Sequence, residues 1–449
     1  MTEVIAIFDI GKTNKKCLLF DKNLKPVYSF EQSFPEIKDE DGFSCDDIDK
    51  IRSWIIETLR DFKNDPSVLV KAVNFSTYGA TLMHLDLHGR EATPLYNYLK
   101  PMPESMMASF YDAHGGVDEF SRKTASPALG FLNSGLQLLW LRNQKPEVYA
   151  RIRDTLHFPQ YCSYLLTGEI VSEYTSIGCH TAMWDFDHMS YHPWIAEVGI
   201  QLPGPIANNT LFGSNIPGFS FLVGCGIHDS SASLVPYLLQ SNDPFIILST
   251  GTWCINMNPF NAEPLTQDQL KQDCLCYMSI NQKPVKSSRF FMGHIHDVNL
   301  DRLNHHFHMD DKAYKTMRLD QGMIQYLKNT KTRFFCNGVP SEYVDESVDL
   351  SAFSSFTEAY HRLMLDLTEQ CVKSIRLILP ENDDSRQMFV TGGFGKNEIF
   401  TGLLAENMPE KSISVSAIDN GSALGAAMVI FRNAGFGELP AIDLGLKGI

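Results

Sequence analysis

Short apolar runs broken by small polar turns recur along the chain. Residues 4–8 (Val-Ile-Ala-Ile-Phe) and 17–20 (Cys-Leu-Leu-Phe) are two such runs, and the residues between them are mostly polar. Because buried strands carry apolar, β-branched runs, the pattern predicts two strands joined as a β-hairpin.

The same pattern returns half a chain later. An apolar run at residues 245–248 breaks at Ser-Thr-Gly-Thr (249–252) and resumes at residues 253–255. Two strand–turn–strand units of one kind predict a duplicated architecture, with a nucleotide bound between the halves.

A third glycine-containing turn lies near the C-terminal end. Residues 388–397 read Met-Phe-Val-Thr-Gly-Gly-Phe-Gly-Lys-Asn, which predicts a strand that runs into Gly392 and Gly393 and a helix that begins near Asn397. Glycines allow a backbone to approach a ligand closely. The late position and the glycine order do not fit a dinucleotide-binding fingerprint, and the sequence has no Walker-type loop.

The first hairpin turn offers groups that bind phosphate. Gly11, Thr13, Asn14 and Lys15 supply backbone N–H, hydroxyl, amide and ammonium donors, while Asp9 is placed to hold a hydrated Mg²⁺. The alternative is that Gly, Thr and Asn serve the turn geometry alone.

A glycine-rich turn at residues 224–228 leads into a helix predicted at residues 230–239, and His228 and Asp229 stand where the helix starts. The helix dipole favours an ionised carboxylate there, which suits Asp229 to accept a proton from a sugar hydroxyl. The alternative is that Asp229 only caps the helix, because Asp is a favoured N-cap.

Alternating strands and helices with short connections predict an α/β fold. The polar, proline-ended segment 240–244 is the expected boundary between an N-terminal domain (1–240) and a C-terminal domain (243–449). Further expected elements are a strand at 69–75 and helices at 46–62, 134–142, 159–166 and 357–379.

The composition narrows the class of protein. The 53 acidic and 38 basic residues give a net charge of −15, which argues against a nucleic-acid or anionic-membrane partner. A predicted strand begins after three residues and no apolar stretch reaches membrane-spanning length, so we expect a cytoplasmic protein without a signal peptide. The ten cysteines form no Cys-x-x-Cys pair and predict reduced, mostly buried thiols.

Five histidines gather between residues 294 and 308. In a strand, His294 and His296 would face the same side, so a metal site is an alternative interpretation. A polar surface is the favoured one, because such tracts are only compositional hints.

Together these segments resemble the FGGY family of carbohydrate kinases, in the sugar kinase–actin–Hsp70 superfamily, over nearly the whole chain. The match rests on the order of similar motifs: the phosphate loops (9–14 and 249–253), the catalytic turn (228–229), the adenosine motif (390–397) and the small-residue helix (421–427). Segments 136–141, 159–169 and 173–178 are similar to N-terminal signatures of the family.

The resemblance implies two actin/hexokinase-like (ribonuclease H-like) domains with an ATP cleft between them, the N-terminal one binding the sugar and the C-terminal one ATP. It implies ATP and Mg²⁺ as cofactors, a small-molecule sugar as partner, and Asp229 as the catalytic base; a homodimer stays open. The implied residues are Thr77, Tyr78, Gly79, Tyr98 and His228 for the sugar, Gly11, Thr13, Asn14, Lys15, Thr250, Gly251, Thr252, Gly392, Gly393 and Asn397 for ATP, and Asp9 for the metal.

Within the family, segments 173–175, 228–233 and 249–253 resemble rhamnulokinases. This implies transfer to a primary hydroxyl of a ketose, with L-rhamnulose as first candidate and L-fuculose, xylulose or ribulose after it. Three features depart from the family. Lys12 replaces a threonine of the first phosphate loop, Tyr-Asn-Tyr-Leu-Lys (96–100) replaces Tyr-Arg-Asp-x-Arg of the sugar pocket, and Arg-Phe-Phe-Met-Gly (289–293) replaces an Arg-Gly-x-Phe-x-Gly region. The alternatives are therefore a catalytically degenerate sugar- or nucleotide-binding homologue, or an ATP switch of the actin or Hsp70 type.

Overall fold

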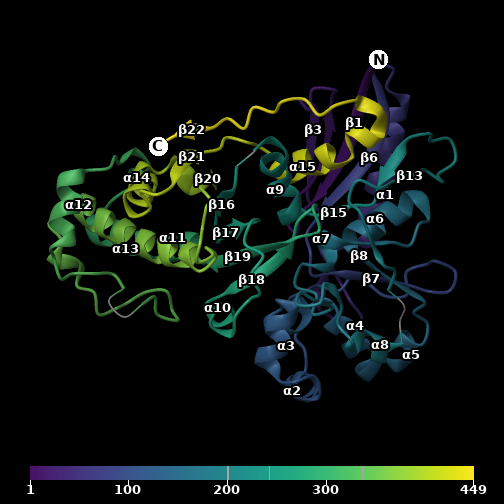
Figure 1. Cartoon of the computed structure of the whole chain (residues 1–449), viewed down its shortest axis with the longest axis horizontal. Coiled ribbons are helices and arrows are strands. Elements are labelled where there is room, and N and C mark those ends of the chain that lie inside the picture. The colour runs from purple at the N-terminus through teal and green to yellow at the C-terminus, as the bar shows by residue number, and fades with distance from the viewer. Residues whose placement is uncertain (200–201, 242, 336–337) are drawn as a thin grey trace.

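The computed structural model describes residues 1–199, 202–241, 243–335 and 338–449, and it contains two seven-stranded sheets with helices packed on them (Figure 1). The order of strands in the first sheet is β13 (Leu211–Gly213), β14 (Leu222–Gly224), β6 (Val68–Thr77), β1 (Thr2–Ile10), β2 (Lys15–Phe20) and β3 (Pro26–Gln32). β15 (Ile227–His228) also pairs with the C-terminal end of β6. The central strand β1 is parallel to β6 and antiparallel to β2.

The second sheet repeats this plan. Its order is β18 (Cys274–Met278), β19 (Pro284–Phe290), β17 (Cys254–Asn258), β16 (Phe245–Thr250), β20 (Gln387–Gly392), β21 (Ser412–Val415) and β22 (Lys447–Gly448). β16 is antiparallel to β17 and parallel to β20, as β1 is to β2 and β6. The two predicted hairpins therefore hold equivalent central places, and the predicted duplication and α/β fold are confirmed.

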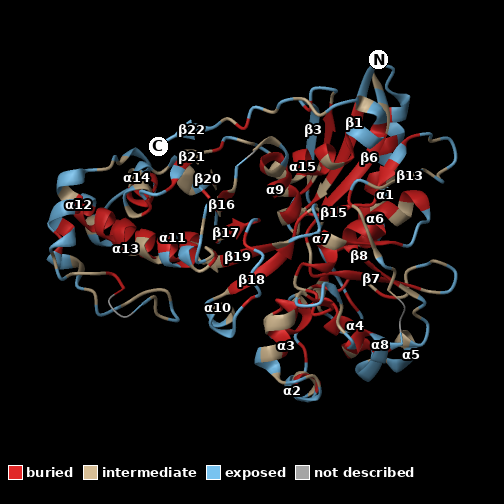
Figure 2. Cartoon of the chain, viewed as in Figure 1, coloured by how far each residue is buried: buried red, intermediate tan, exposed pale blue. Residues whose placement is uncertain are grey.

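Helices flank both sheets, and buried residues gather along the strands and along α13 (Figure 2). The helices of the first half are α1 (Ile48–Asn64), α2 (Glu104–Ala113), α3 (Val117–Thr124), α4 (Leu136–Gln144), α5 (Pro146–Tyr149), α6 (Phe158–Thr167), α7 (Tyr174–Ile177), α8 (Trp194–Val198) and α9 (Asp229–Gln240). Those of the second half are α10 (Gln267–Lys271), α11 (Met292–Phe307), α12 (Gln321–Lys328), α13 (Phe356–Arg376), α14 (Glu398–Asn407) and α15 (Gly421–Ile430).

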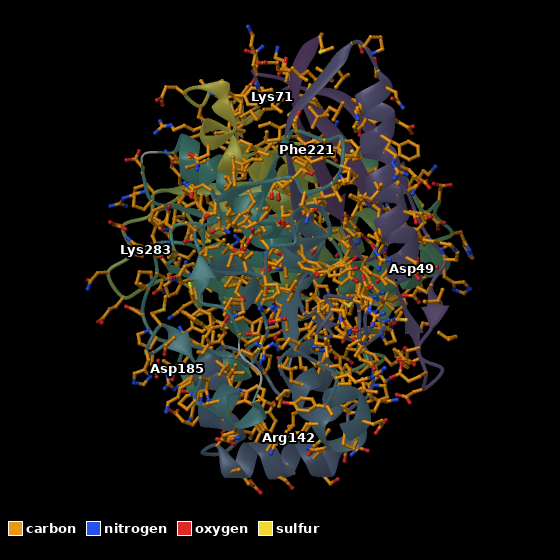
Figure 3. The ribbon with its side chains drawn as sticks, turned by 90° about the vertical axis from the view of Figure 1, so that its right-hand side faces the viewer. Asp49, Lys71, Arg142, Asp185, Phe221 and Lys283 are labelled. Carbon is orange, nitrogen blue, oxygen red and sulfur yellow. The ribbon has the colours of Figure 1, made fainter. Side chains whose placement is uncertain are left out.

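Four short two-stranded sheets lie in the loops of the first half, and one of them, formed by residues 172–173 and 205–206, is parallel. They are β4 (Ile37–Lys38) with β5 (Ser44–Cys45), β7 (Leu82–Leu85) with β8 (Asp154–His157), β9 (Ser172–Glu173) with β12 (Pro205–Ile206), and β10 (Trp184–Asp185) with β11 (Ser190–Tyr191). Figure 3 shows the molecule from the side; Arg142 and Lys283, both labelled there, are exposed. Within the described ranges, no helix combines the length and apolar character needed to cross a bilayer.

The C-terminal segment contacts both halves. Helix α15 packs against α9 and the first sheet, where Ala426 shares a buried cluster with Ile7. The approach is so close that a Cβ on Gly425 would lie 1.9 Å from the carbonyl oxygen of Ala232. The chain then returns to the second sheet as β22 (Figure 1). The division at residues 240–243 stays a prediction for the chain, while in space α15 lies with the first half.

Some local expectations need correction. The helix expected from residue 46 begins at Ile48, because the side chain of Asp47 caps it by accepting the N–H of Lys50. His294 and His296 lie in α11 rather than in a strand, so they do not share a face. Among the described residues, no cluster of three or more His, Cys, Asp or Glu is placed to hold a metal ion. Asn242, in the expected boundary segment, lies outside the described residues.

The described cysteines agree with the expectation of reduced thiols. All nine of them are buried and none forms a disulfide. We therefore assign them no role in cross-linking the chain.

Candidate active site

The turn before α9 places His228 and Asp229 at the edge of the first sheet. His228 pairs with Thr77 at the C-terminal end of β6, so the sheet fixes the turn. His228 is the N-cap residue and Asp229 the first residue of the helix, and the Asp229 carboxylate accepts hydrogen bonds from the N–H (2.5 Å) and hydroxyl (3.2 Å) of Ser230. The interpretation of Asp229 as the N-cap is therefore wrong.

His228 is a buried, neutral neighbour of Asp229. Its Nε2 lies 3.1 Å from the Sγ of Cys179 and 3.2 Å from the Oδ1 of Asp229. Burial lowers the pKa of His228 to about 4, so the imidazole is uncharged at pH 7. The carboxylate of Asp229 consequently has no cationic partner in this ring.

Side chains from both halves of the chain surround Asp229. Its charge acts on Asp9 of β1, on Tyr98, and on Tyr277 of β18 in the second sheet. Burial raises the pKa of Asp229 to about 6, and the bonds from Ser230 act in the opposite direction. A third of the side chain (34%) stays exposed, so solvent screens part of the effect. A carboxyl group with a pKa close to neutrality suits proton transfer.

The residues predicted to bind a sugar gather around this turn. Gly79 leaves no room for a side chain, because a Cβ would lie 2.9 Å from the Sγ of Cys179 and 3.1 Å from the Cδ2 of His228. The rings of Tyr78 and Tyr98 meet edge to face, with 6.1 Å between their centroids. The structure thus brings Thr77, Tyr78, Gly79, Tyr98 and His228 together beside Asp229.

Asp9 lies at the end of β1, next to the first hairpin turn. Its Oδ2 accepts a hydrogen bond from the Oγ of Ser422 in the first turn of α15 (2.8 Å). Burial raises the pKa of Asp9, and the charge of Asp229 adds to this effect. A carboxylate is a hard oxygen ligand that attracts a cation. Asp9 therefore fits Mg²⁺, which takes few protein ligands and completes its shell with water and phosphate oxygens.

The first hairpin turn is closed by a hydrogen bond from the N–H of Gly11 to the carbonyl of Asn14 (2.9 Å). Thr13 and Asn14 are exposed at its tip. Lys15 differs, because its ammonium group is buried and bonded to the Oδ1 of Asp46 (2.9 Å) and the carbonyl of Lys12 (2.9 Å). The structure therefore does not place Lys15 with the other predicted phosphate ligands, since a buried ammonium must keep its partners.

Sequence reasoning missed Asp46, which links the first hairpin to Tyr78. Its carboxylate also accepts bonds from the Nζ of Lys12 (2.7 Å) and the hydroxyl of Tyr78 (2.7 Å). Burial acts to raise the pKa of Asp46, but the bonds from Lys12 and Lys15 outweigh it and the pKa lies below its usual value. Two lysines in one phosphate-type turn were a signal that a buried carboxylate lies nearby.

A pocket of about 200 Å³ lies on the second half, where the turns after β16 and β20 meet. The oxygen of the Thr250 side chain holds these turns together, because it donates to the carbonyl of Thr391 and accepts the N–H of Phe394 (3.1 Å). The pocket is lined by Gly251, Thr252, Gly293, His296, Asp297, Tyr314, Gly393, Phe394 and Asn397. Residues predicted for nucleotide binding from two distant segments thus line one pocket.

The two glycines of the third segment serve different purposes. Gly392 has a φ of 84°, and a Cβ there would lie 1.8 Å from the carbonyl oxygen of Thr250, so the fold itself requires glycine. At Gly393 a Cβ would meet no atom within 4 Å. The backbone at Gly393 is therefore open to a ligand in the pocket.

The segment Glu-Tyr-Thr at residues 173–175 supports the turn that carries His228 and Asp229. The buried carboxylate of Glu173 accepts the N–H of Thr175 (2.7 Å) and of Ser176 (2.6 Å), both of their hydroxyls, and the amide of Asn208. The Oγ1 of Thr175 in turn accepts the backbone N–H of His228 (3.1 Å). This network fixes the backbone that carries His228 and Asp229.

The altered segment 96–100 is mostly bound to the loop before it. Tyr96 donates to Glu40, Asn97 donates to the carbonyl of Ser44 (3.0 Å), and Lys100 is paired with Asp39 (2.5 Å). Tyr98 is the member of this segment that meets Tyr78.

Comparisons with known proteins agree with these motifs. Residues 4–203 match the N-terminal domain of the FGGY family of carbohydrate kinases, and residues 242–438 match the C-terminal domain of carbohydrate kinase FGGY. The chain belongs to the FGGY family of carbohydrate kinases, and the resemblance seen in the sequence is confirmed.

A curated relative is the rhamnulokinase of Yersinia pestis (strain Pestoides F), 28% identical over 247 residues, which are 52% of this chain and 48% of the relative. The chain thus spans about half the length of the curated relatives it matches. Two solved structures share the fold. A carbohydrate kinase from Novosphingobium aromaticivorans has a TM-score of 0.79, 22% identity, and coverage of 100% of this chain and 94% of that one. Plasmodium falciparum glycerol kinase with ADP has a TM-score of 0.73, 16% identity, and coverage of 95% and 89%.

Proposed function

We propose that this protein is an ATP-dependent carbohydrate kinase that transfers the γ-phosphate of ATP to a primary hydroxyl of a ketose. The observation that carries the proposal is Asp229, a carboxyl group with a pKa raised to about 6 among side chains of both halves. Family membership supports the class of reaction, and the rhamnulokinase relative supports a ketose.

The proposed mechanism assigns each side chain one task. The sugar lies against Tyr78 and Tyr98, with one hydroxyl directed to Asp229. As this oxygen forms its bond to the γ-phosphorus and the bond to ADP breaks, Asp229 takes the hydroxyl proton. Neutral His228 lies beside the carboxylate without neutralising it. Positioning and charge stabilisation supply most of the rate in phosphoryl transfer, so a fixed turn matters as much as the base.

We assign the nucleotide to the pocket at Gly393, with Thr250, Gly251 and Thr252 on the phosphate side. The ADP bound to the glycerol kinase of similar fold supports a nucleotide as ligand. Asp9 would hold Mg²⁺, which supplies charge neutralisation of the phosphate oxygens when bound. Gly11, Thr13 and Asn14 would face the phosphates from the first hairpin.

Gly393→Val is expected to weaken ATP binding at least about tenfold, a loss of about 1.4 kcal/mol, with little effect on sugar affinity. A Cβ at residue 393 meets no protein atom within 4 Å, so the branched side chain would extend into the space left for the ligand. Calorimetry with ATP measures the effect. Gly213→Val is a matched control, because a Cβ on Gly213 also meets nothing within 4 Å and lies outside the pocket. Unchanged ATP affinity in folded Gly393→Val would move the nucleotide elsewhere.

The sugar itself is proposed to be a ketose with an apolar face, with L-rhamnulose first. The partly buried Tyr98 offers aromatic surface beside the buried ring of Tyr78, and Asn97 and Lys100 are bound to the neighbouring loop instead of facing the site. Directional bonds to hydroxyls are therefore fewer, which favours a deoxy sugar. Measuring kcat/KM for L-rhamnulose, L-fuculose, xylulose, ribulose and glycerol tests this. A preference for glycerol would overturn the ketose assignment but not the kinase assignment.

The pH dependence of kcat/KM is expected to reflect Asp229. The group must be deprotonated to accept a proton, and burial raises its pKa to about 6. Activity should therefore hold above pH 7 and fall by about tenfold per pH unit well below pH 6. A profile that stays flat down to pH 5 would contradict a base of this pKa.

A further inference from the structure

A hydrogen-bond chain ends on a carboxylate at the wall of the nucleotide pocket. The Nδ2 of Asn397 lies 2.9 Å from the hydroxyl of Tyr360, which lies 3.1 Å from the Nε2 of His296. The Nδ1 of His296 lies 2.8 Å from the Oδ1 of Asp297. Asn397, His296 and Asp297 line the pocket, and Tyr360 lies buried behind them.

The partners fix the direction of every bond in this chain. The Oδ1 of Asn397 accepts the N–H groups of Ile399 and Phe400 at the start of α14, so its amide nitrogen must be the atom that donates to Tyr360. Among the described residues, the hydroxyl proton of Tyr360 then has the Nε2 of His296 as its acceptor. A neutral imidazole that accepts at Nε2 carries its proton on Nδ1, which donates to Asp297.

This arrangement gives Asp297 a defined face toward the pocket. Its Oδ1 is held by His296, and its Oδ2 remains a pure acceptor on a side chain that is three-quarters exposed (75%). The rings of Tyr314 and Phe394, each 5.2 Å from the ring of His296, add aromatic surface to the same wall. Such surface suits the faces of a planar base.

We infer that Asp297 selects the base of the nucleotide, by accepting a hydrogen bond from an exocyclic amino group such as that at position 6 of adenine. The inference rests on the proposed function and names the specificity residue of its nucleotide site. A group that can only accept hydrogen bonds strengthens the binding of a base that carries a donor and does not strengthen the binding of a base that lacks one.

Calorimetry with two triphosphates tests this: ATP and purine riboside triphosphate, which differs from ATP by lacking the 6-amino group. We expect the wild-type protein to bind ATP about tenfold more tightly, the lower end for a hydrogen bond to a charged group because Asp297 is exposed. In Asp297→Asn, His296 still donates to the amide oxygen, so the amide NH₂ faces the pocket. The preference for ATP should then fall to within about twofold.

Two further variants separate this role from a structural one. Asp301→Asn, one turn further along α11 and outside the pocket lining, should keep the wild-type preference. Tyr360→Phe keeps the packing but releases the Nε2 of His296, so the preference should fall while the protein stays folded.

The failure of this inference can be told from the failure of the proposed function. If the wild-type protein binds neither triphosphate, the proposed function is wrong. If it binds both equally, or if Asp297→Asn keeps the wild-type preference, nucleotide binding stands and the role of Asp297 is overturned.

Discussion

Replacement of Asp229 by Asn is expected to lower kcat for sugar phosphorylation by about 10²–10⁴-fold while ATP affinity stays near that of the wild-type protein. The amide has nearly the same shape, and it still accepts the N–H of Ser230 through its oxygen. It cannot take up the hydroxyl proton, because an amide is not basic near neutral pH. The nucleotide pocket is lined by other residues, so its affinity should not change.

Steady-state ADP release measures this loss, and calorimetry with ATP gives the binding control. Asp301→Asn is the matched variant, since it makes the same chemical change at an exposed position of α11. More than a tenth of the wild-type kcat in Asp229→Asn would remove the residue from its assigned role.

The second large effect is expected for Glu173→Gln, which should lower the free energy of unfolding by about 3 kcal/mol. The carboxylate of Glu173 accepts five bonds from Thr175, Ser176 and Asn208, and an amide would turn a donor toward some of these donors. Burial raises the pKa of Glu173 above its usual value, although the bonds from Ser176 and Thr175 act in the opposite direction.

The same change should reduce kcat, because the Oγ1 of Thr175 also accepts the backbone N–H of His228. Urea unfolding measures the stability change. Glu169→Gln, at an exposed position before the network, should change stability by no more than about 0.5 kcal/mol. A loss below 1 kcal/mol for Glu173→Gln would mean that the network contributes little to holding the turn.

The sequence predicted those parts of the fold that depend on local pattern. The apolar runs around residues 9–15 and 249–252 defined both hairpins, because a buried strand needs an uninterrupted apolar stretch. The glycines at 392 and 393 predicted a close approach of the backbone to a ligand; in the structure Gly392 instead lies against the backbone of Thr250, and Gly393 is open. The motif at residues 228–229 indicated the site, since few other turns combine glycines, a histidine and a carboxylate at a helix start.

The pattern of apolar and polar residues does not predict which segments far apart in the sequence contact each other. Lys15 was interpreted as a phosphate ligand because its turn suggested one, but its position is decided by Asp46, 31 residues away. Helix α15 lies with the first sheet because its small residues allow a close approach to α9. Small residues in the sequence do not by themselves indicate which helix they will pack against. The role of Glu173 likewise depends on where Thr175 meets His228.

The most direct test of the central claim uses ATP labelled in its γ-phosphate. The label is followed in the presence of Mg²⁺ and each ketose of the panel. The account predicts that the label appears in a sugar phosphate esterified at a primary carbon, and that Asp229→Asn forms this product at less than a tenth of the wild-type rate. Label that stays in ATP, or appears only as inorganic phosphate with every sugar, would contradict the assignment of a carbohydrate kinase.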